Sequence, residues 1–146
     1  MSCSRASRRS SIFPRVGQTS PVQTQTELPR GKKAANVEAT LLVEDEGAFS
    51  AEPIPEIGTG PIKVSKSEYG DGYTAKFEVM NQMAAPLKSP RVDVVCYDNA
   101  KKIIGGAFAF PDLIPPSDKA VTEVDLLVAT KPTSCVAYAS PSALMD

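Results

Sequence analysis

The chain has 146 residues, of which 42% are hydrophobic, and its formal net charge is −1 with no histidine. This length suits one domain of ordinary size. Without histidine, the commonest general base and the commonest zinc ligand are missing, and the three cysteines have no CxxC spacing. The composition therefore excludes most enzyme classes, structural zinc sites and dithiol redox motifs.

The N-terminal part of the chain carries its charge in blocks. Residues 1–33 hold seven basic side chains and one acid, whereas residues 34–56 hold six acids and no base. Large apolar residues are too few here to offset the entropy cost of ordering the chain. We therefore predict that residues 1–61 form a disordered polyampholytic tail, which ends in a Pro/Gly-rich linker over residues 51–61.

Three further features of this tail bear on structure and partners. Its arginines could contact nucleic acid or anionic lipid, but a charge run is usually a solvated segment, so we expect no nucleic-acid partner. Residues 1–16 are followed by neither a long apolar run nor an A-x-A-like site, so we expect no signal peptide in the given chain, and no transmembrane segment. Residues 36–46 fit a short helix as well as a strand.

From residue 62 onward, apolar residues alternate with polar ones at the period of a β-strand. Clusters of Gly, Pro, Asn and Asp separate the alternating runs, and no run has a convincing helical period. This pattern predicts an all-β fold, a small antiparallel two-sheet sandwich over residues 62–140 with a short C-terminal tail over residues 141–146; a closed barrel is the alternative. The predicted strands lie at residues 62–65, 73–80, in the two arms of a hairpin over 90–110, at 120–128 and at 134–139.

Five short motifs occur in this β region: FEVMN at residues 77–81, VVCYD at 94–98, KIIG at 102–105, LIPP at 113–116 and CVAY at 135–138. In this combination they resemble the FxLYD domain family over roughly residues 62–140. The resemblance implies an immunoglobulin-like sandwich in a bacterial secreted or cell-envelope protein, with no known catalytic residue to carry over. It places Asn81, Tyr97 and Asp98 at family-motif positions. We also expect no cofactor and no metal.

The chain departs from the family pattern at four places. Val94 stands where the family has phenylalanine, and Cys96 stands where it has leucine. The glycine usual in the hairpin turn is replaced by Ala100-Lys101, and the glycine that tends to follow the crossing proline is replaced by Ser117-Asp118. The Tyr-Asp pair that ends the hairpin motif agrees with the family.

An immunoglobulin-like arrangement would make the strands that carry Cys96 and Cys135 neighbours. A disulfide between these cysteines is then geometrically possible, and it is expected in an oxidising compartment. The alternative is that both are small buried hydrophobic residues. The two interpretations are equally supported by the sequence.

The chain has more apolar bulk near its turns than a small core obviously needs. A candidate interface therefore comprises Tyr69, Tyr73, Phe108, Phe110 and Leu113. The competing interpretation, which the period-two spacing favours, is that Phe108 and Phe110 fill the interior of the sandwich.

We expect the function of a non-catalytic, extracytoplasmic binding or spacer module of the cell envelope, with a protein or envelope component as its partner; the oligomeric state stays open. The first alternative is an accessory domain or fragment of a larger secreted or lipoprotein-type protein. The weakest alternative is a carboxylate-only hydrolase that uses Asp93 with Asp98, or Asp112 with Asp118. For these carboxylates a solvated surface position is favoured, and for Asp98 the closing of a turn.

Overall fold

The computed structural model describes residues 19–42 and 57–141, and all structural statements concern these residues. Within them the chain forms seven antiparallel strands and no helix. The all-β fold class predicted from the alternating pattern is confirmed. The strands are β1 (Ile57–Thr59), β2 (Lys63–Lys66), β3 (Tyr73–Asn81), β4 (Arg91–Tyr97), β5 (Ile103–Ala109), β6 (Lys119–Val128) and β7 (Ser134–Ser140).

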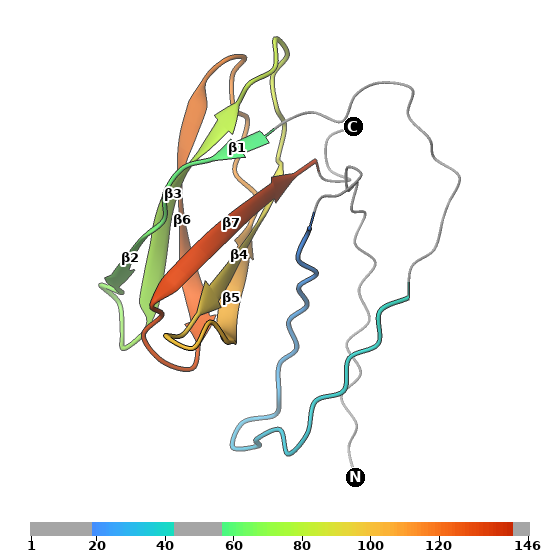
Figure 1. Ribbon diagram of the computed structural model, residues 1–146, viewed down its shortest axis with the longest axis vertical. Helices are drawn as coiled ribbons and strands as arrows, with labels where there is room; N and C mark the ends of the chain where they lie inside the picture. The colour runs from blue at the N-terminus through green and yellow to red at the C-terminus, as the bar shows by residue number, and fades with distance from the viewer. Residues whose placement is uncertain (1–18, 43–56, 142–146) are drawn as a thin grey trace.

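The strands form one sheet that folds over on itself into two layers (Figure 1). In one layer, β3 pairs with β6 along one edge and with both β1 and β2 along the other. In the second layer, β4 lies between β5 and β7. Thr59 of β1 approaches β7 from the first layer, since its hydroxyl donates to the Ala137 carbonyl at 3.2 Å. The architecture is the expected antiparallel sandwich.

Two glycines make the connection between the layers. Gly105 and Gly106 of β5 pair with Val128 and Leu127 at the end of β6. A Cβ atom at Gly105 would run into the Leu127 carbonyl, and one at Gly106 would run into the Val94 carbonyl. The fold of the sheet from one layer to the other therefore depends on these two residues, which let backbones approach closely.

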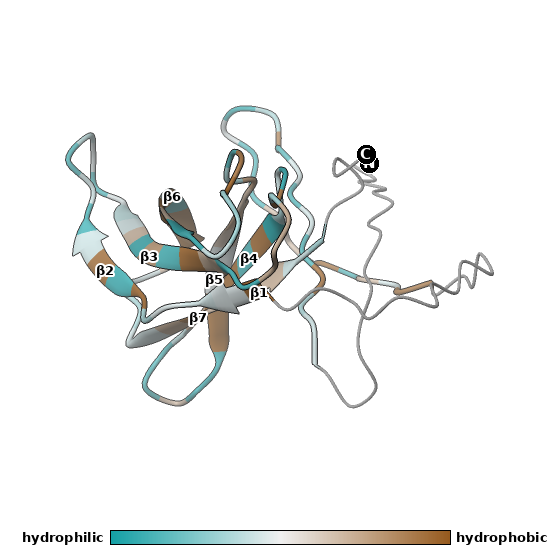
Figure 2. Cartoon of the chain, turned by 90° about the horizontal axis from the view of Figure 1, so that it is seen from above, coloured by the Kyte–Doolittle hydropathy of each residue, from teal (hydrophilic) through white to brown (hydrophobic). Residues whose placement is uncertain are grey.

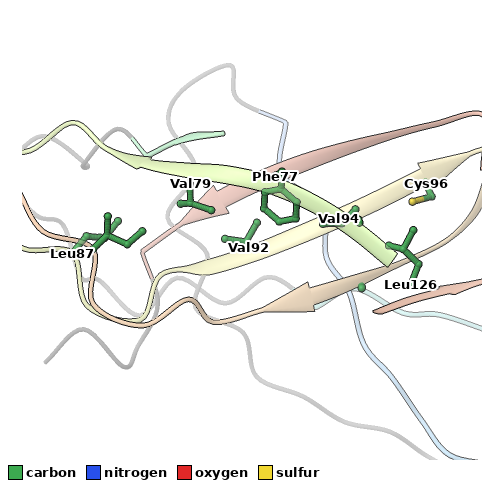
Figure 3. Close-up of a cluster of buried hydrophobic side chains, with 10 residues drawn as sticks. Phe77, Val79, Leu87, Val92, Val94, Cys96 and Leu126 are labelled. Carbon is green, nitrogen blue, oxygen red and sulfur yellow. The ribbon is translucent and has the colours of Figure 1, made fainter. Parts of the chain in front are cut away.

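The core lies between the layers, where side chains from β3 and β4 point toward one another (Figure 3). Teal and brown bands alternate along β2 and β3 in Figure 2, as expected for strands with one face buried and one solvated. The buried core residues are Ala75, Phe77, Val79, Leu87, Val92, Val94, Cys96, Ala107, Ile114 and Leu126.

Asn81, at the end of β3, ties together two loops at this end of the sandwich. Its buried side-chain amide donates to the carbonyls of Ala85, Ile114 and Pro115 at 2.8, 3.1 and 3.0 Å. Its side-chain oxygen accepts from the Met83 amide at 3.0 Å. Asn81 therefore has a structural role in this chain, because it satisfies backbone groups in loops that the strands do not pair.

The turn between β4 and β5 is closed by Asp98. Its Oδ1 accepts from the backbone amides of Ala100 and Lys102, both at 2.9 Å. The predicted turn function of Asp98 is confirmed. Lys101 within this turn has a φ of 59°, in the left-handed region that favours glycine.

The linker prediction is wrong at its C-terminal end. Proline and glycine predict no regular structure over residues 51–61, yet Ile57–Thr59 forms β1 and pairs with the last residues of β3. Gly58 lies opposite Met80, and a Cβ atom there would be 3.0 Å from the Met80 Cε. Glycine leaves room for this methionine, so the sandwich begins at residue 57 rather than 62. Residues 51–56 lie outside the described residues.

The ambiguous element over residues 36–46 is only partly described. Residues 36–42 form neither a helix nor a strand and are exposed, so both predicted forms are wrong for this part. The remainder lies outside the described residues, as do residues 1–18 of the predicted tail and residues 142–146.

Candidate functional site

The outer side of the layer centred on β4 carries buried residues where a solvated surface is expected. Along β4, Val92 and Val94 belong to the core, so Arg91, Asp93 and Val95 project to the opposite side of the strand. These three residues are nevertheless only 8%, 5% and 6% exposed. We call the outward surface of β4 and of its neighbours β5 and β7 the β4 face.

Arg91 and Asp93 form an ion pair within the β4 face. Residues two apart on a strand share a face, which places the two side chains together. Arg91 Nε donates to Asp93 Oδ1 at 3.1 Å and to Oδ2 at 2.9 Å, and Nη2 donates to Oδ1 at 2.8 Å. Because both charges are withdrawn from water, each depends on the other for compensation.

Two aromatic rings from the β5 strand and its exit surround the Arg91 guanidinium. Its central carbon lies 5.0 Å from the centroid of the Phe108 ring and 5.9 Å from that of Phe110. The two rings meet edge to face, with centroids 6.1 Å apart. A cation over the negative face of a ring is a favourable arrangement, and it strengthens as water is removed.

This placement corrects the favoured interpretation of Phe108 and Phe110. The core residue of β5 is Ala107, whereas the two phenylalanines lie with Arg91 on the outside. Since β5 is apolar on both faces, its period of two cannot decide which set points inward. The cation at Arg91 gives the rings a partner on the outer side.

Part of the N-terminal segment covers the β4 face. Gln23 Nε2 donates to the Val94 carbonyl at 2.7 Å, and Arg91 Nη2 lies 3.5 Å from the Gln23 carbonyl oxygen. Pro21 and Gln23 are half-buried, whereas Val22 between them is exposed. In Figure 1 this blue start of the described chain runs beside the layer of β7, β4 and β5. The predicted free tail is therefore attached to the domain at this point.

Tyr138 of β7 extends the β4 face on the side away from β5. It lies opposite Asp93 in the pairing of β4 with β7. Burial raises the pKa of Tyr138, and a hydrogen bond with Tyr97 raises it further. Tyr97 thus interacts with a side chain of the neighbouring strand.

The five candidate interface residues do not gather at one place. β3 runs from Tyr73 at one end of the sandwich to Asn81 at the other, and Asn81 binds the loop that contains Leu113. Tyr69 lies in the turn just before β3, and therefore at the same end of the sandwich as Tyr73. Its side chain is almost fully exposed. Phe110 and Leu113 lie at the opposite end. Only the phenylalanine pair belongs to the β4 face.

The carboxylate pairs considered for acid and base chemistry are separated by their structural roles. Asp93 is buried against Arg91, so a solvated position is wrong for it, while Asp98 closes the hairpin turn. Asp112 and Asp118 are exposed, as expected. Among the described residues, no group of three or more acidic or cysteine side chains is placed to hold a metal ion.

Cys96 and Cys135 lie directly opposite one another in the pairing of β4 with β7. They are joined by a disulfide, with Cα atoms 4.1 Å apart. Of the two interpretations that the sequence left open, the structure therefore has the bridge. The disulfide links the central strand of its layer to the neighbouring strand, at the end of β4 that leads into the hairpin turn.

Sequence reasoning missed Arg91 and Gln23, and for Asp93, considered there as a partner of Asp98, it favoured a solvated surface position. The sequence did contain a signal for the pairing of Arg91 with Asp93, because an arginine and an aspartate two residues apart in a strand share one face. Gln23 gave no such signal, since its partner lies far along the chain and its neighbours are polar.

No family model, curated protein or solved structure matches the chain. Within residues 19–42 and 57–141, no helix has the length and apolarity that a membrane span requires.

Proposed function

We propose that this protein is a non-catalytic, extracytoplasmic binding or spacer module of a bacterial cell envelope, with the β4 face as its binding surface. The observation that carries this proposal is the disulfide between Cys96 and Cys135. Disulfides persist in secreted and cell-surface proteins and are rare in the reducing cytosol. The disulfide therefore supports an oxidising compartment for the folded domain.

The backbone supports the resemblance to FxLYD domains on which the envelope assignment rests. Lys101 and Ser117 have φ values of 59° and 54°. They belong to the two turns where the family pattern has glycine, which adopts this left-handed conformation at little cost. The chain keeps a glycine-like turn geometry at both places with other residues.

One observation favours the alternative of an accessory domain in a larger envelope protein. Val37, Leu41 and Leu42 are large apolar side chains that stay exposed before the sandwich begins. An adjoining domain would cover such residues. The carboxylate-only hydrolase has less support, because Arg91 holds both oxygens of the buried Asp93.

The test is the location and thiol state of the full chain in the organism that produces it. A tagged Cys3→Ser variant retains only the cysteines of the bridge, so all thiols seen after reduction belong to Cys96 and Cys135. We expect the protein in the envelope or secreted fraction, with both sulfurs resistant to alkylation in denaturant until a reductant is added; the denaturant is needed because Cys96 is buried in the fold. The matched control is the same variant expressed in the cytosol, where both thiols should react in denaturant without a reductant.

Recovery in the cytosolic fraction with two free thiols would contradict the proposed compartment. Detection of the tag in a polypeptide much larger than 15.5 kDa would favour the accessory-domain alternative.

A further inference from the structure

We propose that the β4 face is a docking site for an extended, uncharged segment of a partner protein, and that the chain's own residues 20–23 occupy this site in the free protein. The partner segment carries a proline and, two residues later, a side-chain amide. This inference rests on the proposed binding function, and it names the surface and the chemistry of the partner.

The contacts of Gln23 define what the site recognises. Its side-chain amide donates to the Val94 carbonyl, and its own carbonyl lies within reach of Arg91 Nη2. A Cβ atom at Gly106 would lie 3.0 Å from Gln23 Nε2, closer than side chains ordinarily tolerate, so glycine at this position admits the amide. The site thus binds one side-chain amide and one backbone carbonyl, and an extended segment can present both groups to it.

The charge of the site explains why its occupant is uncharged. Asp93 already compensates Arg91, which leaves no net charge for a ligand to meet. Residues 17–26, which include the occupying segment, contain no acidic or basic side chain. An added charge on the occupant would lose water without gaining a partner.

Proline suits the second position of the occupant. Pro21 is half-buried, and the proline ring fixes φ near the value of an extended polyproline helix. A segment that is already extended loses less conformational entropy when it docks.

The chain's own segment leaves part of the surface for a partner to cover. Phe110 is 40% exposed although its ring lies beside Arg91, and Val136, opposite Val95 on β7, is 42% exposed. A longer partner segment can cover both residues in addition to the contacts made by Gln23. This extra apolar contact allows a partner to displace a segment that competes at the high local concentration set by its tether.

The experiment measures binding of a fluorescently labelled peptide, with the sequence of residues 17–26, to the full chain by anisotropy. Three forms of the chain are compared: the unaltered protein, Gln23→Ala and the matched control Gln25→Ala, whose glutamine is exposed. Gln23→Ala weakens the internal occupant, so we expect it to bind the peptide about fivefold or more tightly than the unaltered chain. Gln25→Ala should bind as the unaltered chain does, and a peptide that itself carries Gln23→Ala should bind none of the three.

Equal peptide affinity for Gln23→Ala and the unaltered chain, or no measurable binding by any form, would overturn the proposal. Sedimentation of the unaltered chain provides the second measurement, and we expect a monomer. A dimer that Gln23→Ala dissolves would show that a second copy, rather than a partner protein, takes the site. Peptide binding is measured on purified protein, so its failure leaves the compartment test unaffected, and failure of the compartment test leaves the peptide result unaffected.

Discussion

The two outer faces of the sandwich carry ion pairs of the same chemical kind in opposite surroundings. On the layer of β3 and β6, Lys76 pairs with Glu123 at 3.8 Å, and the two side chains are 57% and 60% exposed. On the β4 face, Arg91 pairs with Asp93 at 2.8 Å, and the side chains are 10% and 7% exposed.

The difference in exposure shows how far each face is solvated. An exposed pair is screened by water and salt and contributes little to stability. A buried pair has given up its hydration, so its two members must compensate each other, and aromatic rings and a chain segment can then lie over it. One face of this sandwich is built to remain in water, whereas the other is built to be covered.

The largest expected difference between the two faces is in the loss of stability when one charge is removed from each ion pair. Arg91→Ala leaves the Asp93 carboxylate buried without its partner, so we expect the free energy of unfolding to fall by about 3–5 kcal/mol. Lys76→Ala leaves Glu123 in water and should change it by less than about 0.5 kcal/mol. Urea unfolding at neutral pH, with the disulfide intact, measures both changes.

A double variant separates charge from packing at the same place. Arg91→Met combined with Asp93→Leu removes both charges and keeps apolar bulk, so it should lose much less stability than Arg91→Ala alone. If Arg91→Ala costs no more than Lys76→Ala, the two faces do not differ in the way described.

An intermediate effect is expected for the apolar residues of the two faces. Phe110→Ala removes a half-covered ring and its contact with Arg91, and should cost about 1–2 kcal/mol. Val121→Ala, on the water-facing side of β6, removes a side chain that is 61% exposed and should cost less than about 0.5 kcal/mol. Phe77→Ala in the core is the upper reference, at about 3–5 kcal/mol. Thermal unfolding ranks the three variants by their loss of stability. A loss for Phe110→Ala equal to that for Phe77→Ala would show that Phe110 is a core residue.

The strands could be predicted from sequence because their signal is local. Alternation along Tyr73–Asn81 identifies β3 without knowledge of its partners, and an aspartate followed by small or polar residues identifies the turn at Asp98. The strand β1 could not be found in this way. Its three residues, Ile57–Thr59, contain a glycine and lie among prolines, so only pairing with the end of β3 makes them a strand.

The β4 face could not be predicted because its burial depends on distant segments. Both faces of β4 carry apolar residues, so the sequence does not tell which side is solvated. Gln23 covers Val94 from a position 71 residues away, within a segment whose composition is typical of a free tail. Arg91 and Asp93 read as ordinary surface charges until that cover is in place.

The smallest expected effect distinguishes the two faces at alkaline pH. On the β4 face, burial and the hydrogen bond with Tyr97 raise the pKa of Tyr138 above its ordinary value of 10.0. On the other face, the hydrogen bond and charge of Glu78 raise the pKa of Lys119 above 10.5. A raised pKa in the folded state gives stability that is complete below the unfolded pKa and is lost as the pH rises through the folded pKa.

Both groups therefore make the fold less stable above about pH 10, but by unequal amounts. Tyr138 is partly withdrawn from water, whereas water screens the interaction of Lys119 with Glu78, so Tyr138 should account for the larger share. Tyr138→Phe should accordingly flatten the decline in unfolding free energy between about pH 9 and about pH 11 more than Lys119→Gln does. Urea unfolding across this interval measures the slopes. A steeper decline in Tyr138→Phe than in the unaltered chain would contradict the sign, and equal flattening by the two variants would remove the distinction between a covered and an open face.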